Sequence, residues 1–287
     1  DPVGSLVADA NFGVIENCHV SGVVEAHAGN VYVLGGLVHL NREGGVVRAC
    51  SSEVSIASTN GAGGLVGSNM GLVIESSSSA IIAQVSGYHS TLVGGLVGVN
   101  SQFDGLSDSG EIDGCSSSGS VEGYDDVGGL VGRLSSGTIQ NSSSSASVTG
   151  HDRVGGLVGS VADSGTGLTA TVEGCNATGD VMGNYYVGAL IGRTGMSGNT
   201  VTINQCFASG SVGGSMYVGG LIGLATNTTV SESYADATML NGVSVGGLVG
   251  AFNSGEVSRC YTDVAFAQDG FFATLGGLVG TNHGTIS

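Results

Sequence analysis

Gly128-Gly129-Leu130-Val131-Gly132 is the stretch of this sequence that decides its fold, because the same phrase returns along the whole chain. Its first Gly recurs, with some imperfect copies, at positions 4, 35, 63, 94, 128, 155, 188, 219, 246 and 276. Self-similarity at a fixed period of about 20 to 50 residues is the signature of a stacked repeat protein. We therefore predict about nine stacked coils of roughly 30 residues each.

A second phrase, Gly-x-Ile/Val-x-x-Cys/Ser, lies between successive copies of the first. Its last residue is here named the marker residue, and the markers are Cys18, Cys50, Ser76, Cys115, Ser142, Cys175, Cys206, Ser233 and Cys260. The step from a marker to the next Gly-Gly is the same in six coils, as from Cys115 to Gly128 and from Ser142 to Gly155, whereas the step from a Gly-Gly to the following marker varies widely. Length variation therefore concentrates at one corner, as expected of a rigid stack with one tolerant turn.

The residues that follow each marker alternate in character. Within residues 115–121 every second residue, beginning with Cys115, is small or apolar, and the residues between them are serines. A period of two is that of a β-strand. Coils of this length cannot bury their own inner face, but stacking them about 4.8 Å apart buries all the inner faces together. We predict an all-β protein, a parallel β-solenoid.

The pairing of Gly-Gly-Leu-Val-Gly with Gly-x-Ile-x-x-Cys/Ser resembles the GLUG repeat over the whole chain. This family occurs in bacterial and archaeal surface proteins, including regions that flank IgA-cleaving metallopeptidases. The resemblance implies a repetitive, adhesin-like segment that is extracellular or on the cell surface. It carries over no catalytic residues, because the zinc motif His-Glu-x-x-His does not occur in this sequence. Residues 1–287 are predicted to be a single repeat domain, either a segment of a longer array or a subunit that stacks end to end, because both ends fall inside the repeat.

Composition excludes several classes of protein. The chain has 55 Gly but one Pro and no three-residue Gly period, so it is not collagen. Its hydrophobic fraction of 41% is enough to build a core. A formal net charge of −17 without any Lys repels phosphate backbones, so we expect no nucleic-acid partner. No apolar run of about 18 residues exists, so no membrane span is encoded.

The core positions raise two questions. Cysteines of neighbouring coils, Cys18 with Cys50 and Cys175 with Cys206, are placed to form disulfides, but Ser replaces Cys at this inward position in three coils. We therefore expect free, buried thiols at all six cysteines, the others being Cys115 and Cys260. The core leucines, such as Leu130 and Leu157, are followed directly by Val, so either the Gly pair bends the chain and both point inward, or an apolar stripe runs along the rod. We favour the bend.

Aromatic and acidic residues are the candidate ligand-binding residues. One position after the marker, Phe207, Tyr234 and Tyr261 should stack in a ladder beside Asp236 and Asp263. A second patch precedes the Gly-Gly in four successive coils, as Tyr124-Asp125-Asp126, His151-Asp152-Arg153, Asn184-Tyr185-Tyr186 and Ser215-Met216-Tyr217, and its candidate residues are Tyr124, Asp125, Asp152, Tyr185, Tyr186 and Tyr217. Aromatic rings beside carboxylates suit sugars. The alternative is that the ladders only stabilise the solenoid.

Metal and enzyme functions have weaker support in the sequence. No closely spaced Cys/His pairs are present, so we expect no metal site and no cofactor. Asp236 and Asp263 could hold a surface Ca²⁺ between them, but we favour two solvated carboxylates. Two carboxylates about 5 Å apart, as expected for Asp125 and Asp152, would suit a retaining glycosidase, but no long loops build a cleft around them. Three Asn-x-Ser/Thr sequons, at Asn141, Asn176 and Asn227, are possible glycosylation sites.

These observations predict a non-enzymatic extracellular scaffold. It would be a stiff rod whose partners are neighbouring copies of itself, flanking domains of a longer chain, or surface glycans bound along the ladders. Two alternatives stay open: a filament-forming subunit or virion fibre, and a carbohydrate-active β-helix enzyme.

Overall fold

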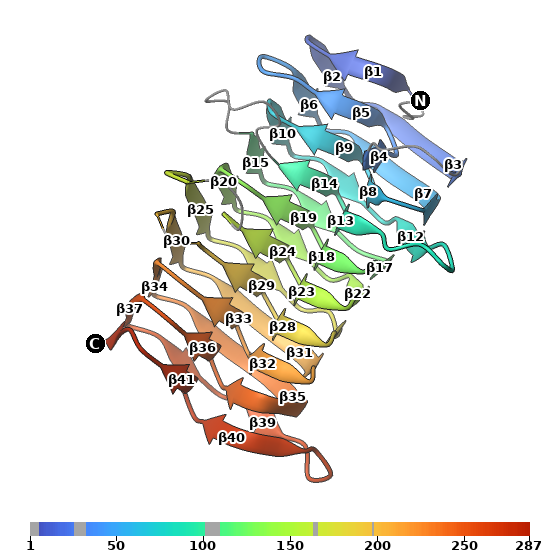
Figure 1. Cartoon of the computed structure of the whole chain (residues 1–287). Coiled ribbons are helices and arrows are strands. Elements are labelled where there is room, and N and C mark those ends of the chain that lie inside the picture. Colours follow the sequence, from blue (N-terminus) through green and yellow to red (C-terminus); the bar gives the residue numbers. More distant parts are fainter. Residues whose placement is uncertain (1–5, 26–32, 101–109, 163–165, 197) are drawn as a thin grey trace.

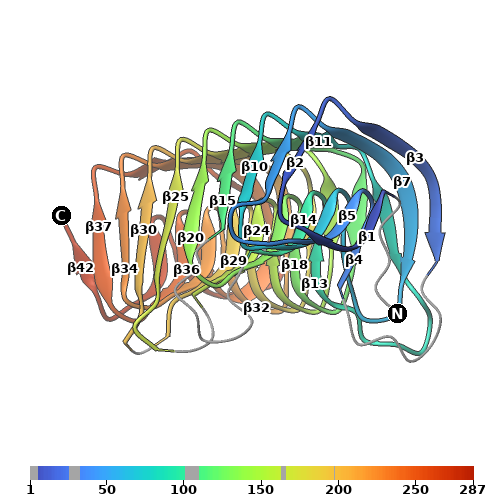
Figure 2. The ribbon, with the colours of Figure 1, turned by 90° about the horizontal axis from the view of Figure 1, so that it is seen from above.

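The computed structural model describes residues 6–25, 33–100, 110–162, 166–196 and 198–287. Within these ranges all the regular structure is β-strand. The chain winds into a parallel β-solenoid, in which successive coils lie side by side from β1 to β42 (Figure 1; Figure 2 shows the stack from above). The predicted fold class is therefore confirmed. The described part of the chain contains no helix that could span a membrane.

Three parallel sheets run along the stack. Sheet 1 follows the Gly-Gly of each coil and consists of β1 (Val7–Asn11), β5 (Val38–Asn41), β9 (Val66–Asn69), β14 (Val97–Asn100), β19 (Val131–Leu134), β24 (Val158–Val161), β29 (Ile191–Thr194), β33 (Ile222–Ala225), β36 (Val249–Phe252) and β41 (Val279–Asn282). Sheet 2 ends just before the marker residues or their equivalent and consists of β2 (Val14–Glu16), β6 (Val46–Arg48), β10 (Leu72–Ile74), β15 (Glu111–Asp113), β20 (Gly137–Gln140), β25 (Thr169–Glu173), β30 (Thr200–Asn204), β34 (Thr228–Ser231), β37 (Gly255–Ser258) and β42 (Thr285–Ile286).

Sheet 3 begins directly after the markers and runs to the next Gly-Gly. Its strands are β3 (His19–Glu25), β4 (Val33–Gly35), β7 (Ser51–Ser58), β8 (Gly61–Gly63), β11 (Ser77–Ser78), β12 (Ile81–Gln84), β13 (Thr91–Gly94), β16 (Ser116–Ser117), β17 (Ser120–Glu122), β18 (Asp125–Gly128), β21 (Ser143–Ser144), β22 (Ser147–Thr149), β23 (Asp152–Gly155), β26 (Asn176–Ala177), β27 (Val181–Met182), β28 (Tyr185–Gly188), β31 (Phe207–Gly213), β32 (Met216–Gly219), β35 (Tyr234–Gly246), β38 (Tyr261–Thr262), β39 (Ala265–Phe266) and β40 (Phe272–Gly276).

The repeated phrases of the sequence lie in register in the stack. Gly128 pairs with Gly94 on one side and with Gly155 on the other. In sheet 1, Val131 likewise lies between Val97 and Val158. The period of the sequence is therefore the length of one coil. Equivalent positions of successive coils form a row along the rod, and such a row is called a file.

The Gly-Gly pair forms the bend between sheet 3 and sheet 1. The consecutive residues Leu130 and Val131 are both fully buried, as Leu157 is in the next coil, so the chain turns between them and no apolar stripe forms. The predicted bend is confirmed. A Cβ at Gly128, the first Gly of the pair, would collide with the carbonyl oxygen of Val131 and with the amide nitrogen of Gly159, so only Gly fits at this point of the bend.

A buried asparagine ladder, absent from the sequence-based predictions, lies at the end of sheet 1 in the first coils. The Nδ2 of Asn11 donates to Oδ1 of Asn41 at 2.8 Å, Asn41 donates likewise to Asn69 at 2.8 Å, and Asn69 donates to Asn100 at 2.7 Å. The ladder ends at the next coil, where Leu134 occupies the paired position. These amides satisfy each other and the carbonyls of the turn that leads to sheet 2.

Candidate functional site

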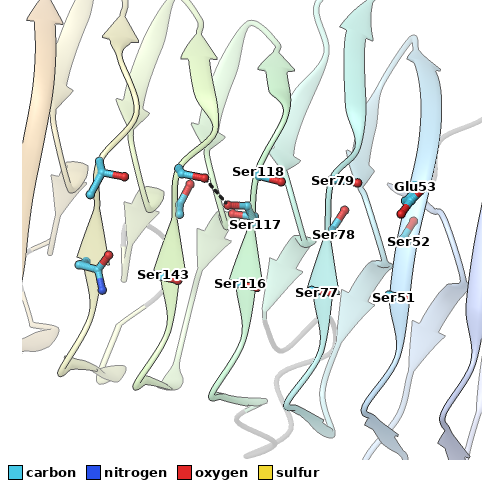
Figure 3. A pocket seen from close by; sticks show the side chains of 14 residues that line it. Ser51, Ser52, Glu53, Ser77, Ser78, Ser79, Ser116, Ser117, Ser118 and Ser143 are labelled. Atoms are coloured by element: carbon cyan, nitrogen blue, oxygen red, sulfur yellow. Dashed lines mark hydrogen bonds between the residues drawn. The ribbon is translucent and has the colours of Figure 1, made fainter.

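A serine-lined groove crosses the outer side of sheet 3, next to the marker corner. Strand register aligns one file of residues directly after the markers, Ser51, Ser77, Ser116, Ser143 and Asn176. A second file lies two residues further on and consists of Glu53, Ser79, Ser118, Ser145 and Thr178. Together with serines between the files they line a groove of about 320 Å³, and Figure 3 shows how the labelled serines repeat from strand to strand. Small side chains in five successive coils make this surface hollow.

The first file of this groove continues into the predicted aromatic ladder. The rings of Phe207 and Tyr234 have centroids 4.5 Å apart, and those of Tyr234 and Tyr261 are 4.8 Å apart with an angle of 5° between their planes. Asp236 pairs with Ser209 of the second file, and the amide of Asp263 donates to the carbonyl of Ala235. Because each inner ring face is covered by its neighbour, this ladder offers ring edges and hydroxyls to solvent rather than a row of free faces.

Asp236 and Asp263 lie side by side and are both exposed. Among the described residues they belong to no group of three or more acids, histidines and cysteines able to share an ion. A Ca²⁺ between them stays an untested alternative to two solvated carboxylates.

The second aromatic patch forms two separate stacks. The ring of Tyr124 lies between His89 and His151, with centroid distances of 4.0 Å and 4.5 Å and near-parallel planes. Tyr185 is tilted by 60° against His151 and so ends this stack. The sequence pattern suggested one continuous patch, but Tyr186 stacks instead on Tyr217, at 5.5 Å and 1°, and Arg193 lies over its ring.

The backbone explains this division of the patch. In the four coils of this patch, the residue two before the Gly-Gly adopts positive φ, with values of 53° at Asp126, 55° at Arg153, 55° at Tyr186 and 56° at Tyr217. Such a left-handed residue breaks the strand alternation, so its side chain does not follow the direction that the sequence pattern implies. Tyr185 and Tyr186 therefore belong to different files.

Asp126 is the clearest consequence of this left-handed conformation. Its side chain is fully buried and forms ion pairs with Arg133 of β19 and with Arg153, whose Nε lies 2.6 Å from the carboxylate. Two guanidinium groups thus hold one buried carboxylate, which satisfies the requirement that a buried charge be paired. The sequence pattern placed Asp126 in the surface patch, and the structure corrects that placement.

Asp125, His151 and Asp152 come together on the solvent side of this ion-pair cluster. Asp125 pairs with Asp152 in register between β18 and β23. One potential ligand atom from each of the three residues lies within 4.8 Å of the other two. The carboxylates are about a quarter exposed, at 25% and 27%. Burial raises the pKa of the Asp125 carboxyl, and the positive charge of Arg153 opposes that rise.

All six cysteines are free thiols. Cys50, Cys115, Cys175 and Cys206 are buried, and Cys18 and Cys260 at the two ends are half-buried. Burial raises the pKa of Cys115 to about 12, and a hydrogen bond with Cys206 together with burial raises that of Cys175. The reactive thiolate form is therefore disfavoured at Cys115 and Cys175.

The three sequon asparagines differ in exposure. Asn141 is exposed and donates to Asp113 at 2.9 Å. Asn176 is half-buried at the end of the serine groove, and Asn227 is half-buried with its amide donating to the carbonyl of Met196. Of the three, Asn141 has the side chain that is easiest for a modifying enzyme to reach.

The geometry defines the chain as a β-solenoid repeat protein with polar and aromatic files along its outer faces. The family described as "The GLUG motif" matches residues 89–122, 123–149 and 214–238, so the chain carries GLUG repeats. No curated protein matches the chain. One similar solved structure is that of a proposed immunoglobulin A1 protease from Bacteroides ovatus, with a TM-score of 0.49 and 16% identity over 94% of this chain and 80% of that chain. A likeness at this level supports no statement about activity.

Proposed function

We propose that this chain is a non-enzymatic extracellular scaffold, a stiff rod that holds an extended glycan along the serine groove of sheet 3. The observation that carries the proposal is the groove itself, which runs without interruption across five coils. Four coil spacings of about 4.8 Å give it a length of roughly 19 Å.

The chemistry of the groove supports a hydroxylated ligand. Each Ser hydroxyl is both a donor and an acceptor of hydrogen bonds, so a row of them can pair with sugar hydroxyls of either orientation. Glu53 and Asn176 add one acidic and one amide group at opposite ends of the groove. Phe207 follows Asn176 in the same file, and only one of its ring faces is covered by a neighbouring aromatic ring, Tyr234. A sugar ring at this end of the groove would contact an apolar surface.

The stiffness of the rod supports the scaffold part of the proposal. Register is continuous from β5 to β41 in sheet 1 and throughout sheet 2, and the core residues between the sheets are closely packed. A preformed groove on a rigid support orders few side chains on binding, so little entropy is lost.

A glycan-array screen followed by calorimetry tests this proposal. The groove variant is Ser116→Arg, which places a long side chain in the middle of the first file without touching the core. Its matched control is Thr138→Arg, which places the same side chain on the outer side of sheet 2, where Thr138 pairs with Glu111 and Thr171. We expect at least a tenfold loss of affinity for Ser116→Arg and no change for Thr138→Arg. Equal binding by both variants, or no glycan bound by the folded protein, would overturn the proposal.

A further inference from the structure

We propose that Asp125, His151 and Asp152 form a binding site for one divalent transition-metal ion such as Zn²⁺. This site is independent of the serine groove, because it lies just before the Gly-Gly bends and not at the marker corner.

The geometry of the three side chains suits a single ion. Two ligands of one Zn²⁺, each about 2.0 to 2.2 Å from it, lie no more than about 4.4 Å apart. The potential ligand atoms here are already within 4.8 Å of one another, and Nδ1 of His151 lies 3.2 Å from Oδ1 of Asp152. Shifts of a few tenths of an ångström would complete a three-ligand site, the number that open zinc sites use.

The same atoms lack other partners. Oδ1 of Asp125, Nδ1 of His151 and Oδ1 of Asp152 are shielded from solvent, and apart from the 3.2 Å approach of the last two to each other, none of them has a hydrogen-bond partner among the described residues. Shielded polar atoms in folded proteins are normally paired, so three such atoms in one place indicate a missing common partner. A cation satisfies all three at once.

The surroundings hold the imidazole in place. The ring of His151 lies parallel to that of Tyr124, at an angle of 4°, which fixes its plane. Its Nε2 lies 3.1 Å from the side-chain amide of Asn184, whose oxygen and nitrogen can exchange places by rotation. With the amide oxygen turned to Nε2, this nitrogen carries the proton and Nδ1 is free to bind the ion. Metal-bound histidines are commonly oriented by such an acceptor.

Charge and donor type select the class of ion. Arg153 pairs with Oδ2 of Asp125 at 3.2 Å, which leaves Oδ1 available and partly balances the two carboxylates. One imidazole with two carboxylates suits Zn²⁺, Mn²⁺ or Fe²⁺, whereas Ca²⁺ and Mg²⁺ prefer sites built from oxygen alone. The net charge of −17 attracts any cation to this protein, so the ligand set and not the overall field must account for selectivity.

Titration of the EDTA-treated, folded protein with ZnCl₂ in a calorimeter tests the site. We expect one ion per chain, at least tenfold weaker binding in His151→Gln and in Asp152→Asn, and no change in Asp263→Asn, which removes a carboxylate from the exposed Asp236/Asp263 pair. Far-UV circular dichroism checks that each variant is folded. Unchanged affinity in folded His151→Gln, or an equal loss in Asp263→Asn, would show diffuse binding to an acidic surface and overturn the proposal.

A second measurement keeps the proposal testable if a variant fails to fold. Co²⁺ bound to the wild-type protein should broaden or shift the NMR signals of the His151 ring and leave those of His19 and His283 unchanged. The absorption spectrum should lack a thiolate charge-transfer band, because the core cysteines take no part. A thiolate band, an undisturbed His151, or full displacement by an equal concentration of Ca²⁺ would contradict the proposed ligand set.

Discussion

Replacement of Asn69 by Ala interrupts the buried asparagine ladder in the middle. Oδ1 of Asn69 accepts from Nδ2 of Asn41 at 2.8 Å and from the amide of Gly71 at 3.2 Å. Its Nδ2 donates to Oδ1 of Asn100 at 2.7 Å, to the carbonyl of Gly71 at 3.2 Å and to the carbonyl of Glu111 at 3.5 Å. Truncation removes all five hydrogen bonds and leaves the neighbouring coils in place.

The magnitude follows from which groups are left without a partner. Asn41 keeps hydrogen bonds from Nδ2 to the carbonyls of Gly45 and Leu72, at 3.2 and 3.3 Å. The amide of Gly71 and Oδ1 of Asn100 lose the partner that Asn69 supplied. Each buried polar group that loses its partner costs about 1 to 3 kcal/mol. We therefore expect Asn69→Ala to lower the free energy of unfolding by about 2 to 6 kcal/mol.

Urea unfolding followed by far-UV circular dichroism measures this loss. The matched control is Asn253→Ala, because Asn253 is exposed and its side chain makes one hydrogen bond, to Oγ1 of Thr226 at 3.2 Å. We expect the control to change the free energy of unfolding by no more than about 0.5 kcal/mol. The double variant Asn69→Ala/Asn100→Ala should cost less than the sum of the two single variants, since it also removes the unpaired Oδ1. If Asn69→Ala is as stable as Asn253→Ala, the ladder is not the stabilising feature inferred here.

Two further predictions concern the core. Burial raises the pKa of Cys115 to about 12 from an ordinary 9.0, so the folded state keeps a proton that the unfolded chain releases. The free energy of unfolding should therefore be unaffected below pH 9 and should fall between about pH 9 and 12, by about 1.4 kcal/mol per pH unit. Urea titrations at pH 8, 9 and 10 should show this slope reduced in Cys115→Ser, whose hydroxyl matches that of Ser142 in the next coil, and identical slopes in the two proteins would refute it. Gly128→Ala, whose Cβ meets the carbonyl oxygen of Val131, should lower the free energy of unfolding by at least about 2 kcal/mol, whereas Gly13→Ala, with open space around its Cβ, should be near neutral; equal stabilities would show that the first Gly of the bend tolerates a side chain.

Most of the fold could be predicted from the sequence because its information is local and repeated. The alternation after each marker gives the strand, and the recurrence of Gly-Gly gives the position of the bend. Parallel stacking then follows, since no coil can bury its inner face alone. The bend at Leu130 and Val131 could be inferred because an unbent strand would have exposed one apolar residue in every coil.

The acid cluster shows where this reasoning fails. Tyr124, Asp125 and Asp126 were predicted to share one outward patch, but the positive φ of Asp126 turns its side chain inward toward Arg133. A left-handed conformation at a residue other than Gly leaves no clear signal in one sequence. His151 was noted in the patch, but its contact with Asp152 depends on this local turn.

The asparagine ladder, in contrast, had a signal that was missed. Asn41, Asn69 and Asn100 occupy the same position relative to Gly35, Gly63 and Gly94, the first Gly of their coils. A polar residue repeated at one coil position can be recognised as a file from the repeat alone. The serine files were recognised in this way as an outer face, but the groove that their small side chains leave was not predicted.

The spacing from marker to Gly-Gly connects the fold to the proposed metal site. Asp125 and Asp152 can face each other only if successive coils take equally long paths to that point, and the steps from Cys115 to Gly128 and from Ser142 to Gly155 are indeed equal. The preceding coil takes a longer path, from Ser76 to Gly94, and it contributes Thr91 to the same file. Insertions in the coils from Gly94 and Gly155 to the next markers lie at the other corner, where they leave this register intact. The equal length of the segments from marker to Gly-Gly therefore sets the separation of the proposed ligands, while the segments at the opposite corner can vary in length. A one-residue insertion after Ser142 would shift Asp152 out of register with Asp125 and should abolish Zn²⁺ binding, whereas the same insertion between Leu134 and Gly137 should preserve it.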